Sequence, residues 1–397
     1  MALQSALSQY ITVTVSYWAF TLTDGALRML VLLFFHDLGY SPFELASLFL
    51  LYEFFGIVTN LYGGWLASRI GVTLCLHIGL SLQIVALTML LIEPSQLTVV
   101  YVMAAQALSG VAKDLNKMSA KSSIKALMPD SQQGRLYRWI AMLTGSKNAL
   151  KGLGFFLGGA LLAAVGFRGS LIAMILLLLP TLLIGGAILQ SQPGTNKQRF
   201  TQSLNKSAAV NWLSLARLFL FCSRDIWFVV ALPVFLQSQL DWSYVEVGTL
   251  MASWVIAYGL VQALAPKVTG HQQGQLPNGQ QLAYWGMLLA LIPCAIALAL
   301  ATVEQPAFIL VAGLLLFGAL FAINSSMHSY LIVAYAQRDA VSLDVGFYYM
   351  ANAAGRLIGT LLSGLLYQQF GLISCLVMSS LTIVISVLAC RGLMAKT

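Results

Sequence analysis

The sequence predicts an all-α polytopic membrane protein with twelve transmembrane helices, and three observations lead to this fold class. Only 9% of the 397 residues are charged, whereas about a quarter are charged in a soluble globular chain. Hydrophobic residues make up 59% of the chain, and its mean hydropathy is +0.83. At roughly 20 apolar residues per spanning helix, this length accommodates about twelve spans with short connections. A soluble enzyme is therefore excluded.

The apolar residues form long runs, such as 171–189 and 372–389, rather than the alternating pattern of a membrane β-barrel. Gly, Pro, Asp and Gln interrupt these runs and mark the turns between helices. The predicted spans run near residues 10–35, 42–67, 73–92, 97–117, 137–165, 170–190, 213–237, 243–265, 281–301, 307–335, 345–368 and 372–390.

Two connections are longer than the others, at 118–136 and 191–212. The second lies midway, so we expect a cytoplasmic linker there, between an N-terminal six-helix bundle (1–190) and a C-terminal one (213–397). With both termini cytoplasmic, the basic loop residues lie inside and only Arg168 lies outside, as the positive-inside rule requires. This bias accounts for the net charge of +8 without a nucleic-acid partner. We expect a multi-pass protein of the cell (inner) membrane that contacts the lipid bilayer.

Small residues spaced seven apart recur near the end of every third predicted span. The pairs are Gly64 and Gly71, Gly159 and Gly166, Gly259 and Pro266, and Gly364 and Gly371. This spacing indicates four three-helix units in inverted pairs, the arrangement of major facilitator transporters. The first copy, GWLASRIG, also resembles the loop 2–3 signature of that superfamily. Ser68 stands where the signature has Asp, and Val72 stands where it has a second basic residue.

Ionisable residues lie within several predicted spans, where each costs roughly 3 kcal/mol at the helix centre, so each is a candidate functional residue. By analogy with the major facilitator fold, spans 1, 5, 7 and 11 line a central cavity of net positive charge. The candidate substrate-binding residues are Arg28, Lys147, Asn148, Lys151, Arg224 and Arg356. The candidates for proton coupling or charge pairing are Asp24, Glu53, Asp114 and Asp225.

A positive cavity favours a small anionic substrate, because the forked guanidinium of Arg binds phosphate-like and carboxylate oxygens bidentately. Lys147 and Lys151 lie four residues apart, repel each other and need counter-charge, which such a substrate would supply. The five cysteines are isolated, and no Cys/His metal spacing or GxxxxGK[ST] nucleotide-binding loop occurs in the sequence. We therefore expect no metal, no cofactor and no catalytic residue.

A structural role is the alternative for the charged pairs. Asp24 and Arg28 share one helical face and would neutralise each other without touching cargo. Arg224 and Asp225 are adjacent and point in different directions, so we expect their partners on other helices. At the inner end of span 4, Lys113 is expected to extend to the membrane interface beside Asp114.

Four stretches resemble one branch of the superfamily, the ArsJ organoarsenical efflux permeases. They are YWAFTLTDGALRMLVLLFF (17–35), AQALSGVAKDLNKMSAKSSIK (105–125), LTGSKNALKGLGFFLGG (143–159) and SRDIWFVVALPVFL (223–236). The resemblance implies export of 1-arseno-3-phosphoglycerate and thereby arsenate resistance. It also implies a functional partner, a glyceraldehyde-3-phosphate dehydrogenase that supplies this substrate. Two anionic groups on a three-carbon backbone agree with separated cationic sites in one cavity.

Three other functions remain to be weighed. An organophosphate, phosphate-ester or other organic-anion exchanger of the same superfamily is the alternative in the same class. A membrane enzyme acting on lipid-linked phosphates would need His, Asp or Glu clustered at one interface, but the histidines at 36, 77, 271 and 328 are scattered. An arsenite pump would need grouped thiolates for a soft ligand. The sequence therefore favours a transporter rather than an enzyme.

Overall fold

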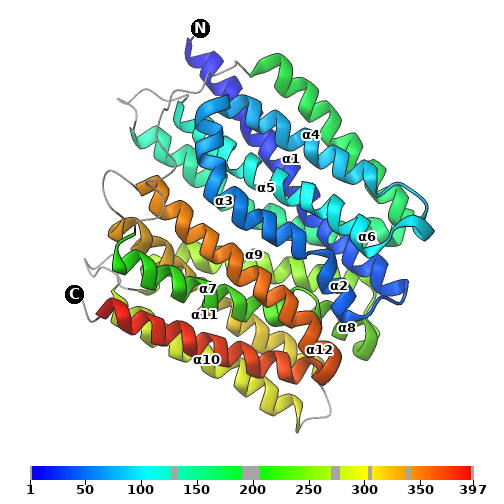
Figure 1. The fold of residues 1–397 in the computed structure, drawn as a ribbon, viewed down its shortest axis with the longest axis vertical. Helices are drawn as coiled ribbons and strands as arrows, with labels where there is room; N and C mark the ends of the chain where they lie inside the picture. The colour runs from blue at the N-terminus through cyan, green and yellow to red at the C-terminus, as the bar shows by residue number, and fades with distance from the viewer. Residues whose placement is uncertain are drawn as a thin grey trace.

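The computed structural model describes residues 2–126, 133–189, 206–269, 278–302, 306–336 and 341–394, and in these ranges every regular element is helical. The long helices run side by side, slanting across the molecule (Figure 1). They are α1 (Ala2–Asp37), α2 (Pro42–Leu48), α3 (Leu50–Ile70), α4 (Val72–Met89), α5 (Val99–Ala126), α6 (Gln133–Ile188), α7 (Ala208–Phe228), α8 (Ala231–Leu240), α9 (Tyr244–Val268), α10 (Gly279–Leu300), α11 (Pro306–Tyr335) and α12 (Val341–Met394), with a 3₁₀ turn at Pro94–Gln96.

The helices account for all twelve predicted spans. Eight helical segments in the described ranges are long and apolar enough to cross a membrane. Two of them, within α6 and α12, contain two spans each, because a glycine with non-helical dihedrals interrupts the helix at Gly166 and at Gly371. The helix α4 is apolar but shorter, and α5 carries several lysines along its length. The predicted twelve-helix membrane fold is confirmed.

Three of the repeated glycines lie at the turns between successive spans. Gly71, Gly166 and Gly371 have φ angles of 91°, 68° and 74°, a region that a residue with a Cβ rarely adopts. The chain therefore reverses its direction with almost no loop. The fourth copy differs, since α9 continues past Pro266 to Val268. The side chains of 63–69, with the Ser68 of the loop signature, lie outside the part that the structure describes.

Two predicted spans are each divided into two helices. Span 2 breaks at Phe49 between α2 and α3, and span 7 breaks at Val229 between α7 and α8. The freed backbone N–H groups of Val230 and Ala231 donate to Ser363 Oγ at 3.3 and 3.0 Å. A side chain of α12 thus supplies the hydrogen bonds that the interrupted helix lacks, as the apolar surroundings require.

The helices form two groups, α1 to α6 in the upper part of Figure 1 and α7 to α12 in the lower part. The groups meet where α6 packs on α9 and where α12 packs on α2 and α3. At one such contact, the backbone N–H of Phe43 donates to Gln368 Oε1 at 3.0 Å. Of the predicted linker 191–212, the part up to residue 205 lies outside the described ranges, and α7 already begins at Ala208.

The α1–α6 and α7–α12 pairs cross through the same kind of close contact. At each crossing, two glycines four residues apart face backbone carbonyls of the partner helix, so close that a Cβ would overlap the carbonyl oxygen. The facing pairs are Gly154 with Leu22, Gly158 with Ala26, Gly355 with Leu218, and Gly359 with Cys222. Arg28 lies two residues beyond Ala26, and Arg224 lies two residues beyond Cys222. The two arginines therefore occupy equivalent positions in the two groups.

Candidate functional site

A cavity of about 520 Å³ lies between the two helix groups. It is lined from α1, α3, α5 and α6 on one side and from α7, α9, α11 and α12 on the other. All six predicted substrate-binding residues line it, and so do Lys113, Lys117 and Arg217. Among the described residues the lining holds eight Lys and Arg side chains against three Asp side chains. The volume suits a small organic molecule, and the charge suits an anion.

Five side chains of alternating charge, two buried carboxylates and three partly buried arginines, link one helix group to the other across the cavity wall. We call Arg28, Glu53, Arg356, Asp225 and Arg224, in that order, the charge ladder. Glu53 Oε1 accepts from Arg28 Nη1 at 3.0 Å and from Arg356 Nη2 at 2.5 Å. Asp225 accepts from Arg356 Nε at 3.2 Å and from Arg224 Nε at 2.6 Å. Because Glu53 belongs to α3 and Arg356 to α12, the ladder joins the two groups.

The ladder changes the pairing that the sequence predicts. Arg28 pairs with Glu53 rather than with Asp24, although Asp24 lies one turn away on the same helix. Asp24 instead accepts a hydrogen bond from the hydroxyl of Tyr52 at 2.7 Å. The expectation of distant partners for Arg224 is also wrong, since it pairs directly with Asp225. A shared helical face predicts which residues can meet. Here a fully buried carboxylate that lies between two arginines takes the place of the pair on one helix, since it needs both cations as counter-charge.

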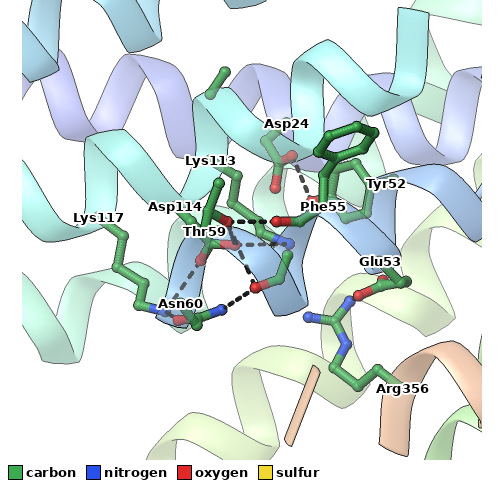
Figure 2. A network of polar contacts seen from close by, with 12 residues as sticks. Asp24, Tyr52, Glu53, Phe55, Thr59, Asn60, Lys113, Asp114, Lys117 and Arg356 are labelled. Atoms are coloured by element: carbon green, nitrogen blue, oxygen red, sulfur yellow. Dashed lines mark hydrogen bonds and ion pairs between the residues drawn. The ribbon is translucent and has the colours of Figure 1, made fainter. Parts of the chain in front are cut away.

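A second polar cluster surrounds Asp114, to the left of Glu53 and Arg356 in Figure 2. Asp114 accepts from Lys117 Nζ at 3.1 Å and from Thr59 Oγ1 at 3.1 Å, and Lys113 Nζ lies 3.8 Å away. Lys117 also donates to Asn60 Oδ1 at 2.9 Å. Lys113 does not extend to a membrane interface as predicted. It lines the cavity instead, because α5 turns this face toward α3.

On the α6 wall, Lys151 is the cation with the fewest partners. Its ammonium lies 5.6 Å from the ring centroid of Phe155, and it forms no ion pair with any described residue. Asn148 donates to Gln262 Oε1 at 3.2 Å and so links α6 to α9. Lys147 lines the cavity one turn before Lys151.

Besides Lys113 and Lys117, a third cavity cation that the sequence did not predict is Arg217 of α7. Its side chain is buried, its Nη1 donates to the backbone oxygen of Ser325 at 3.3 Å and to Ser325 Oγ at 2.9 Å, and its guanidinium lies 4.0 Å from the ring centroid of Phe221. The signal was present in the sequence, since Arg217 stands one turn inside an apolar predicted span. Within the described ranges no group of His, Cys, Asp and Glu is arranged to hold a metal ion.

Comparison with known protein families shows which family of membrane proteins the chain belongs to. The model described as the Major Facilitator Superfamily matches residues 11–278 and 213–395. The chain belongs to the major facilitator superfamily. A search of curated proteins gives no match. As a major facilitator protein, it is an integral membrane transporter.

In a major facilitator transporter, the substrate site lies near the middle of the membrane, where the structural repeats meet. The charged cavity lies between the two helix groups, and the charge ladder beside it lies within predicted spans. The superfamily contains transporters of many cargoes, so the chemistry of the cavity has to indicate the substrate.

Proposed function

We propose that this transporter exports a small organic anion with phosphate-like groups, and specifically the organoarsenical 1-arseno-3-phosphoglycerate. The observation that carries the proposal is the excess of Lys and Arg over Asp around one cavity between the helix groups. The resemblance of four sequence stretches to the ArsJ permeases supports the arsenylated cargo. In this proposal Arg28, Lys147, Asn148, Lys151, Arg224 and Arg356 contact the substrate.

Two carboxylates keep the ladder arginines in place. Glu53 and Asp225 hold the three ladder arginines through charge-assisted hydrogen bonds, which are the strong ones at low dielectric. The ladder still has one cation more than it has carboxylates, so an oxyanion adds to it without first removing a negative charge. Lys151 provides a further positive charge on the α6 wall.

Alternating access then moves the anion outward. With both termini in the cytoplasm and an inside-negative inner membrane, each negative charge that leaves gains about 2.3 kcal/mol per 100 mV. A multiply charged anion is therefore exported by uniport without ATP. A glyceraldehyde-3-phosphate dehydrogenase supplies the cargo from arsenate, and breakdown of the acyl arsenate outside prevents its return.

The same cavity favours one other function, a phosphate-ester exchanger. Arg and Lys bind phosphate and arsenate groups through the same oxygen geometry, so the described side chains select an oxyanion rather than arsenic. An exchanger differs from an exporter in one measurable respect, because phosphate added on the opposite side accelerates its transport.

The test uses cells without other arsenic defences that express this protein, the dehydrogenase, both or neither. Arsenic retained in the cells is measured after exposure to arsenate. We expect arsenic to fall only when both proteins are present, and Lys147→Ala or Arg356→Ala to abolish the effect at unchanged membrane abundance.

Arg168→Gln is the matched control. Arg168 pairs with Glu93 at an exposed position, with side chains 58% and 64% accessible, and lies outside the cavity, so export should be unchanged. Equal arsenic retention in all four strains would contradict the organoarsenical cargo, and counter-flow of phosphate would then be measured in vesicles.

A further inference from the structure

Arg217 is a buried cation without a carboxylate partner in the described ranges. Its residue is 4% exposed, and both of its hydrogen bonds go to the neutral Ser325. The three ladder arginines differ, since each binds Glu53 or Asp225. A charge removed from water without a counter-ion is costly. A cavity that retains such a charge is built to receive an anion there.

The surroundings of Arg217 hold its Nη1 atom and leave its buried Nε atom without a hydrogen-bond partner among the described residues. Tyr258 donates to Ser325 Oγ at 3.1 Å, and Ser325 in turn accepts from Arg217 Nη1. The rings of Phe221 and Tyr348 lie 4.0 and 5.1 Å from the guanidinium carbon. The edge formed by Nε and Nη2 is the one that binds an oxyanion bidentately.

The opposite wall has its own cation without an ion pair, Lys151. Arg217 and Lys151 do not occupy equivalent positions in the two helix groups. Arg217 stands one residue before Leu218, whose carbonyl faces a glycine, and in α1 the equivalent position is Thr21. Thr21 is uncharged, and its hydroxyl donates to Tyr17 O at 2.7 Å. Each helix group therefore contributes one uncompensated cation, from α6 in one and from α7 in the other.

We propose that Arg217 forms a second anion-binding subsite, and that a cargo with two separate anionic groups bridges the cavity with one group on Arg217 and the other on Lys151. Ser325 and Tyr258 position the guanidinium for this contact. The proposal rests on the proposed function only in requiring that organic anions enter the cavity, and it does not depend on arsenic.

The test compares the binding of two probes to the purified protein in lipid nanodiscs. 3-Phosphoglycerate carries a phosphate and a carboxylate, whereas glycerol 3-phosphate carries the phosphate alone. The wild type should bind 3-phosphoglycerate about tenfold more tightly, the difference that one charge-assisted hydrogen-bonded contact makes. Arg217→Gln and Lys151→Gln should each remove this preference, and a wild-type melting curve of the purified variant shows that it is folded.

Two further variants keep the test decisive. Arg168→Gln should preserve the preference, because Arg168 is exposed outside the cavity. Should Arg217→Gln bind neither probe, Arg217→Lys keeps the charge but cannot bind bidentately, so it should retain only part of the preference. A full preference in Arg217→Lys would then contradict the subsite.

The outcomes separate this inference from the proposed function. Equal affinity of the wild type for the two probes, or a full preference in folded Arg217→Gln, would overturn the second subsite and leave anion export standing. Failure of the wild type to bind either probe would overturn the anion-binding cavity itself.

Discussion

The two walls of the cavity share the same backbone packing, which we call the frame, and differ in the side chains that line the cavity. Both are built on glycines that bring a helix against the carbonyls of its partner, and both place an arginine at the same position, Arg28 and Arg224. The α1–α6 side adds lysines and the Asp114 cluster. The other side surrounds Arg217 and Arg224 with aromatic rings, among them those of Phe221 and Phe321.

The difference indicates which part of the repeat is structural and which part is functional. The glycine crossings recur because only a residue without a side chain allows backbones so close. In the proposed function the charges are free to differ, since an organic anion with unlike ends does not share the two-fold symmetry. Two walls with the same helix packing but different side chains suit a substrate whose two ends differ.

The largest effect is expected at the residue that joins the walls, Glu53. Its side chain is fully buried and binds Arg28 and Arg356, so Glu53→Gln leaves two cations poorly compensated. Breaking a buried ion pair costs about 3–5 kcal/mol. We expect a clear fall in the melting temperature of the detergent-purified protein and loss of export. Glu93→Gln, which removes an exposed carboxylate, should change neither, and a wild-type melting curve for Glu53→Gln would show that the ladder does not hold the walls together.

A smaller, matched effect is expected at the two crossings. A Cβ would lie 2.5 Å from Ala26 O in Gly158→Ala and 2.7 Å from Cys222 O in Gly359→Ala. Overpacking of this kind costs about 1–3 kcal/mol, so thermal unfolding should show similar losses for both variants. Gly186→Ala is the control, because nothing lies within 4 Å of its added Cβ. A loss at only one crossing would mean that the walls do not share their frame.

The smallest effect is expected at Asp24. Its hydrogen bond from Tyr52 survives in Asp24→Asn, since an amide oxygen also accepts, and within the described residues it forms no ion pair. Export measured at several pH values should stay within about twofold of wild type, the change that half a kcal/mol produces. Asp225→Asn, which removes the carboxylate that binds Arg224 and Arg356, should lose export. A loss of export in Asp24→Asn alone would instead place a proton-coupling step at this carboxylate.

The sequence predicts the helical framework of this molecule well, because burial in a membrane requires a recognisable pattern of apolar residues. Runs of apolar residues predict the spans, and glycines such as Gly166 and Gly371 mark their turns. Arg28 and Arg356 are recognisable as cavity residues because a charge in an apolar span is too costly to be incidental. The breaks at Phe49 and Val229 have no such signal, since apolar residues continue through them.

The pairing inside the cavity is much harder to predict than its composition. Glu53 and Arg356 are 303 residues apart, and only the packing of α3 against α12 brings them together. Asp24 and Arg28 satisfy the spacing rule for one helical face, yet each finds a better partner on α3. Arg217 is not predicted as a cavity residue, because it stands close to the predicted start of its span, where an arginine commonly reaches the interface.

The single oxygen of Glu53 that serves two arginines has a consequence for kinetics. An arriving anion that draws Arg28 or Arg356 toward itself leaves the carboxylate still neutralised by the other arginine. In the proposed function, cargo and carboxylate therefore exchange counter-ions one at a time, so the Glu53 carboxylate keeps an arginine partner at every step. Within that proposal, such an exchange lowers the energy barrier both for binding and for release of a highly charged anion.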